Sequence, residues 1–117
     1  MQGPRNILIV EDEPLIAMML EDFLDALDRV PAGTADNVAE ALDRIGAGGI
    51  DAAILDVNLR GGEQSWPIAD KLAELGIPFV LATGGADDSI AQSHRDRPVL
   101  SKPFTLDRVD KVLSSLI

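Results

Sequence analysis

One apolar run near the middle of the chain limits the possible folds more than any other feature. Residues 52–55 are Ala-Ala-Ile-Leu, and Asp56 and Val57 follow them directly. A short run that is apolar on both faces and bounded by polar residues predicts a strand buried on both sides, as in the middle of a parallel sheet. We therefore expect a strand over residues 51–56, with Asp56 at the carboxyl end, where open α/β sheets bind their ligands.

The rest of the chain alternates short apolar runs with amphipathic segments. The runs predict four more strands, over residues 6–10, 29–34, 79–83 and 98–101. Pro31 places the second of these at an edge of the sheet, because proline has no N–H to donate to a ladder.

The amphipathic segments predict five helices. They cover residues 14–27, from Asp36 or Asn37 to about 45, from 66 or 67 to 75, a short loosely held helix within 84–98, and a last helix from 106. In the first helix the apolar positions with helical spacing are Leu15, Met18, Met19, Phe23, Leu24 and Leu27. Five strands that alternate with five helices predict an α/β fold with a parallel sheet in the order 2-1-3-4-5.

Composition narrows the class of protein. The chain has 117 residues, which fits one domain over residues 1–117, and its net charge of −10 disfavours direct binding to nucleic acid or to anionic membranes. It has no Cys, so disulfides, thiolate nucleophiles and cysteine zinc sites are excluded. No segment resembles a signal peptide or a membrane span, so we expect a cytoplasmic protein that does not insert into membranes.

Polar side chains follow four of the predicted strands. Glu11 and Asp12 come after the first strand, Asp56 ends the third, Thr83 ends the fourth, and Lys102 follows the fifth. Carboxyl ends of parallel strands share one edge of the sheet, so these side chains should converge there.

Converging carboxylates require a cation. Three carboxylates within about 4 Å of one another repel by about 4 kcal/mol per pair at an effective dielectric of 20, which one lysine would not offset. A hard oxygen site of this kind suits Mg²⁺ better than zinc. A carboxylate nucleophile, a metal, a hydroxyl and an ammonium are the groups needed to form an aspartyl phosphate, and Asp56, on the most buried strand, is the best nucleophile.

Four motifs in this order resemble the response-regulator receiver domain, a flavodoxin-like fold, over essentially the whole chain. They are Ile-Val-Glu-Asp-Glu-Pro at 9–14, Ile-Leu-Asp-Val-Asn-Leu at 54–59, Ala-Thr-Gly at 82–84 and Lys-Pro-Phe at 102–104. Residues 78–84, Pro-Phe-Val-Leu-Ala-Thr-Gly, are similar to a subgroup of single-domain receivers with a Pro-Phe-x-Phe-Ala-Thr-Gly strand.

The resemblance implies a role for each candidate residue. Asp56 would be the phosphoacceptor, and Glu11, Asp12, Asp56 and the backbone carbonyl of Asn58 would hold Mg²⁺. Thr83 and Lys102 would contact the phosphoryl group. The phosphoryl donor would be a histidine kinase or a histidine phosphotransfer protein in a two-component phosphorelay. The chain would assist its own phosphorylation and dephosphorylation rather than act as an enzyme, and would signal through a downstream protein partner.

Two other functions stay open at this point. Many receivers have an aromatic switch residue where this chain has Val99, so a phosphate sink or relay intermediate without conformational output is one alternative. The other is a small Mg²⁺-dependent phosphohydrolase. Such enzymes normally place a second Asp two residues after the nucleophile, and this chain has Asn58 there.

Overall fold

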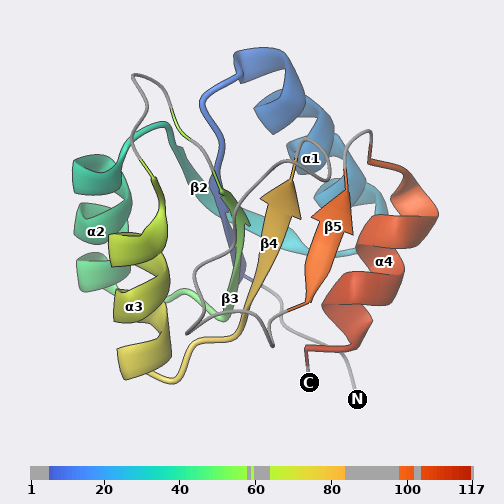
Figure 1. The fold of residues 1–117 in the computed structure, drawn as a ribbon. Coiled ribbons are helices and arrows are strands. Elements are labelled where there is room, and N and C mark those ends of the chain that lie inside the picture. Colours follow the sequence, from blue (N-terminus) through green and yellow to red (C-terminus); the bar gives the residue numbers. More distant parts are fainter. Residues whose placement is uncertain (1–5, 58, 60–63, 84–97, 102–103, 117) are drawn as a thin grey trace.

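Five parallel strands form one sheet at the centre of the molecule (Figure 1). The computed structural model describes residues 6–57, 59, 64–83, 98–101 and 104–116. The strands are paired in the order β2-β1-β3-β4-β5, as predicted. Their bounds are β1 Asn6–Val10, β2 Val30–Ala35, β3 Ala52–Asp56, β4 Phe79–Thr83 and β5 Val99–Ser101.

Four helices lie within the described part of the chain. They are α1 Pro14–Ala26, α2 Val38–Ala47, α3 Trp66–Glu74 and α4 Leu106–Ser114. Asn37, one of the two predicted caps, caps α2 because its side chain accepts a hydrogen bond from the Glu40 N–H. The helix predicted within residues 84–98 lies outside the described residues, so the last helix of the chain is α4.

The helices cover both faces of the sheet (Figure 1). Successive side chains of a strand point to opposite faces, so each strand supplies both cores. Leu8 and Leu55 belong to the core beneath α2 and α3, whereas Ile9 and Ile54 belong to the core beneath α1 and α4. Every residue of β3 is buried, as predicted for the central strand.

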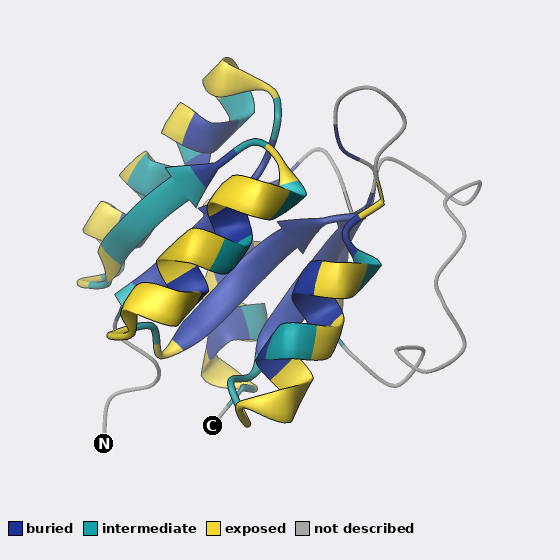
Figure 2. Ribbon diagram, turned by 90° about the vertical axis from the view of Figure 1, so that its left-hand side faces the viewer, coloured by how far each residue is buried: buried dark blue, intermediate teal, exposed yellow. Residues whose placement is uncertain are grey.

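The strand β2 forms an edge of the sheet, as Pro31 indicates. Its pairing with β1 shifts register between Ile7 and Leu8, opposite the step from Pro31 to Gly33. Most of its residues are only half-buried, in contrast to the buried central strands (Figure 2).

The prediction for the inner face of α1 was partly wrong. Leu24 is buried and Met19, Phe23 and Leu27 pack against the core, but Leu15 and Met18 are 79% and 58% exposed. Ala17 and Leu20 take the inner positions instead. The prediction relied on the spacing of the large apolar residues. It was partly wrong because a small residue, Ala17, packs against the sheet in this helix.

Within the described residues, none of the helices has both the length and the apolar character that crossing a lipid bilayer would require.

Candidate functional site

The site lies at the carboxyl edge of the sheet, where β1 and β3 are neighbours. The register pairs Val10 with Leu55, so Glu11 and Asp56 follow at equivalent positions on the two strands. The Glu11 N–H donates to the Ala35 carbonyl at 2.9 Å, which continues the β1 ladder one residue past the strand. Backbone pairing therefore brings these two carboxyl-bearing residues to the same place.

Three carboxylates converge at this edge. Glu11, Asp12 and Asp56 each offer a carboxylate oxygen, and these oxygens all lie within 4.8 Å of one another. Glu11 and Asp56 are 4% and 5% exposed, whereas Asp12 is half-buried. The Glu13 N–H donates to Glu11 Oε2 at 3.2 Å, which helps to orient that side chain.

This donor set fits Mg²⁺. All three groups are hard carboxylate oxygens, they come from two neighbouring strand ends, and two of them are buried. At these separations the three charges repel one another, and a divalent cation would offset that repulsion. Glu11, Asp12 and Asp56 are therefore the described residues that could hold the ion.

Of the other residues that the sequence analysis singled out, Thr83 and Val99 lie within the described part of the chain, and Asn58 and Lys102 do not. Thr83 is the last residue of β4, next to β3 in the sheet, and is 5% exposed. Asn58 and Lys102 lie outside the described residues, so their predicted roles remain predictions. Val99, at the position of the aromatic switch residue, is the first residue of β5 and is 42% exposed.

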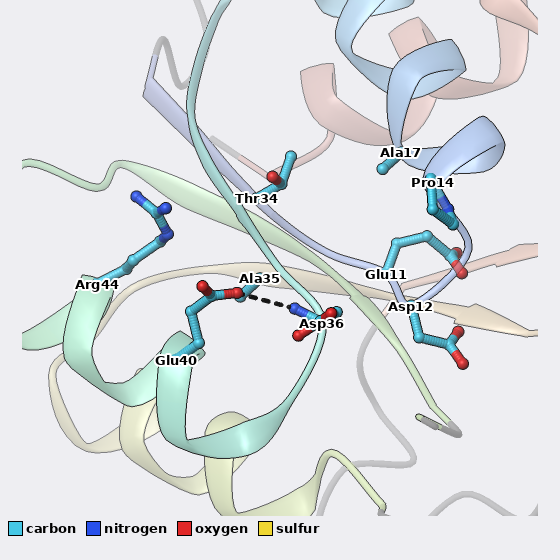
Figure 3. A pocket seen from close by; sticks show the side chains of 9 residues that line it. All are labelled: Glu11, Asp12, Pro14, Ala17, Thr34, Ala35, Asp36, Glu40 and Arg44. Atoms are coloured by element: carbon cyan, nitrogen blue, oxygen red, sulfur yellow. Dashed lines mark hydrogen bonds between the residues drawn. The ribbon is translucent and has the colours of Figure 1, made fainter. Parts of the chain in front are cut away.

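A pocket of about 270 Å³ adjoins Glu11 and Asp12 on the side of α2 (Figure 3). Asp36 and Glu40 line it, and Arg44 extends from α2 at the other end of the hollow. The Asp36 N–H donates to Glu40 Oε1 at 3.2 Å. The sequence indicates Asp36 only as a helix cap, and it gives no signal that Glu40 and Arg44 of α2 would line a pocket beside the site.

Comparisons with known proteins agree with the geometry. The family described as response regulator receiver domain matches residues 7–114. The phyllosphere-induced regulator PhyR of Methylorubrum extorquens is 30% identical over 116 residues, covering 96% of this chain and 43% of PhyR. The transcriptional regulatory protein MalR of Bacillus subtilis is 29% identical over 114 residues, covering 93% of this chain and 48% of MalR. This chain spans less than half of the length of either regulator.

A solved structure is similar over its full length. The solution structure of SdrG from Sphingomonas melonis Fr1 matches with a TM-score of 0.90 and 66% identity, covering 99% of this chain and 98% of SdrG. The BeF3-activated conformation of SdrG, assigned to Pseudomonas melonis Fr1, matches with a TM-score of 0.84. Because the family match covers nearly the whole chain and the fold and strand order agree with it, this chain belongs to the response regulator receiver domain family.

Proposed function

We propose that this receiver domain is a phosphoacceptor switch that takes a phosphoryl group onto Asp56 from a phosphohistidine of a partner protein. The observation that carries the proposal is the convergence of Glu11, Asp12 and Asp56 within 4.8 Å at the carboxyl edge. Asp56 ends the central strand and is 5% exposed, so its carboxylate is held by a rigid element. Nucleophiles on rigid strands keep the geometry that group transfer needs.

The proposed transfer is a displacement at phosphorus. An Oδ atom of Asp56 attacks the phosphorus atom, a P–O bond forms as the P–N bond breaks, and the imidazole leaves with the electron pair. Mg²⁺, when bound, would neutralise charge on the phosphoryl oxygens. The Thr83 hydroxyl and the Lys102 ammonium are proposed to donate to those oxygens, and Glu11 and Asp12 to hold the metal, with the Asn58 carbonyl.

The proposed partners are proteins. The donor is a histidine kinase or a histidine phosphotransfer protein, as the family membership supports. A relative from Bartonella quintana, 25% identical, is described as the anti-anti-sigma factor PhyR, which supports a protein as the downstream partner here.

The proposed output runs from Thr83 into β5. Thr83 pairs with Ser101, so a shift of the Thr83 hydroxyl toward a phosphoryl oxygen would move the neighbouring strand. Val99 of β5 and Leu106 of α4 are 42% and 38% exposed, so each presents an apolar side chain to solvent. The existence of a BeF3-activated conformation of SdrG supports a conformational response in this chain.

Phosphoryl transfer from a phosphorylated histidine kinase tests the site. Intact-mass measurement should find one added phosphoryl group on the wild type and none on Asp56→Asn. Asp51→Asn is the matched control, because Asp51 directly precedes β3, at the end opposite to Asp56, and should be labelled like the wild type. Labelling of Asp56→Asn at the wild-type rate would contradict the assignment.

Beryllofluoride titration tests the output separately. We expect amide chemical shift changes at Thr83, in β5 and at the start of α4 when Mg²⁺ and beryllofluoride are added. Changes confined to residues around Asp56 would instead support the phosphate sink.

A further inference from the structure

We propose that Ser65 is a positioning residue for the phosphoacceptor: it fixes the peptide that follows Asp56 and thereby holds the Asp56 carboxylate toward Glu11 and Asp12. This inference rests on the proposed function, since it concerns the same site. It adds a residue that takes no direct part in binding the metal or the phosphoryl group.

The backbone of Val57 is held on both sides. Its N–H donates to the Ala82 carbonyl at 3.0 Å, which extends the ladder between β3 and β4 past Asp56. Its carbonyl accepts from the Ser65 N–H at 3.2 Å and from Ser65 Oγ at 3.4 Å. Val57 and Ser65 are both 0% exposed, so these bonds are shielded from water.

The Ser65 hydroxyl does not serve as a helix cap. Ser65 precedes α3, where a serine normally accepts a hydrogen bond from an N–H of the first turn. Among the described residues no such side-chain bond forms, and the Ser65 backbone, at φ −87° and ψ 7°, is not extended as a cap residue usually is. The hydroxyl points back to the Val57 carbonyl instead.

Ser65 couples the phosphoacceptor strand to a rigid helix. Its carbonyl accepts from the N–H groups of Ile68 and Ala69, both at 3.0 Å. Ile68, Ala69 and Leu72 of α3 are 0% exposed against the sheet. The packing of α3 therefore fixes Ser65, and Ser65 in turn fixes the backbone next to Asp56.

Loss of the hydroxyl should loosen that support. Ser65→Ala keeps the backbone N–H but leaves the Val57 carbonyl with one donor instead of two, so the Asp56 side chain samples more orientations. Metal sites are sensitive to such supporting contacts. Because the hydrogen bond from Ser65 Oγ is long, its loss should weaken Mg²⁺ binding without abolishing it. We expect the Mg²⁺ dissociation constant to rise about threefold to tenfold.

The experiment is a Mg²⁺ titration of the full chain followed by amide chemical shifts. Ser65→Thr keeps a hydroxyl and should bind within about twofold of the wild type. Two control variants should bind Mg²⁺ like the wild type. Ser115→Ala removes another hydrogen bond from a serine hydroxyl to a backbone carbonyl, at the end of α4. Ile45→Val weakens the core under α2. Amide exchange of Val57 should be faster in Ser65→Ala than in Ile45→Val, even at equal thermal stability.

The outcomes separate the two proposals. Wild-type affinity in Ser65→Ala, or an equal loss in Ser65→Thr and Ser65→Ala, would overturn the role of the Ser65 hydroxyl while leaving the phosphoacceptor proposal intact. Wild-type protein that binds no Mg²⁺ and accepts no phosphoryl group would overturn both. If Ser65→Ala does not fold, the comparison of Ser65→Thr with Ser65→Cys, whose thiol is a weaker donor, decides the question: equal affinities would overturn the inference.

Discussion

The two edges of the sheet carry different kinds of connection. At the amino edge, helices return to strands through turns that contain left-handed residues: Asp28, Gly48, Gly49 and Gly76 all have positive φ. At the carboxyl edge, Glu11, Asp12 and Asp56 follow their strands and bring like charges within 4.8 Å. Left-handed caps satisfy helix carbonyls and favour folding, whereas clustered carboxylates oppose it. The turns at the amino edge therefore stabilise the fold, whereas the carboxylate cluster at the carboxyl edge lowers its stability.

The same contrast separates Asp51, which directly precedes β3, from Asp56, which ends it. Asp51 is exposed at the amino edge, and its Oδ2 accepts a hydrogen bond from the Asn6 N–H at 2.9 Å, which ties β1 to the start of β3. Asp56 is buried beside two other acidic side chains. Identical side chains at the two ends of β3 therefore have opposite effects on folding.

Asp12→Asn tests the contrast most strongly. Removing one charge of the cluster should weaken Mg²⁺ binding by about 10-fold to 100-fold and, by relieving repulsion, raise the unfolding free energy without Mg²⁺ by about 1 kcal/mol. Calorimetric titration and denaturant unfolding measure the two effects. Asp36→Asn, which changes the adjoining pocket outside the carboxylate cluster, should weaken binding by less than about threefold. If Asp12→Asn instead lowered the unfolding free energy without Mg²⁺, repulsion among the three carboxylates would not be destabilising the fold.

Gly76→Ala tests the amino edge. Gly76 has a φ of 72°, and a Cβ there would meet nothing within 4 Å, so the cost is conformational only. We expect the unfolding free energy to fall by about 1–2 kcal/mol. Gly46→Ala is the control, because Gly46 lies in α2 with the same open surroundings and should raise stability by up to about 1 kcal/mol. Equal changes in unfolding free energy for Gly76→Ala and Gly46→Ala would contradict the stabilising role of the left-handed turn at Gly76.

Asp51→Ala removes the bond to the Asn6 N–H. The unfolding free energy should fall by about 1 kcal/mol, while Mg²⁺ binding stays unchanged. Asp51→Asn keeps an acceptor oxygen and should recover most of the loss in a denaturant titration. A change in Mg²⁺ affinity in either variant would show that the two ends of β3 are not independent.

Asp28→Gly should give the smallest effect and raise stability. Asp28, with a φ of 62°, ends α1 as Gly76 ends α3: the Arg29 N–H bonds the Leu24 carbonyl at 2.8 Å, and the Ile77 N–H bonds the Leu72 carbonyl at 2.9 Å. Glycine adopts this conformation without a Cβ penalty, so we expect a gain of about 0.5–1 kcal/mol in thermal unfolding. Asp25→Gly, inside α1, should instead lose a similar amount.

Sequence periodicity identified most elements because their patterns are local. The predicted bounds of β1 and β4 and the predicted start of α4 agree with the structure, and β3, α2 and α3 differ by a residue or two at their ends. The inner face of α1 was less predictable. Several residues there are apolar, and only the packing against the sheet decided that Ala17 lies inside and Leu15 outside.

The pocket beside the site and the contact between Ser65 and Val57 could not be predicted from the sequence. Asp36, Glu40 and Arg44 line the same pocket as Glu11, and nothing in their spacing along the sequence indicates that. Ser65 has the residue type of a helix cap, and nothing in the sequence indicates that its hydroxyl donates to the carbonyl of Val57, eight residues earlier.

By itself, the sequence determined the alternation of strands and helices and the polar site residues that follow four of the strands, since a parallel sheet brings all carboxyl ends to one edge. The tertiary structure decided which of these carboxylates are buried and which contacts support them. Local patterns indicate which residues form a strand and where it ends. The burial of a side chain depends on how distant segments pack, and Glu11, Asp56 and Ser65 acquire their environments only there.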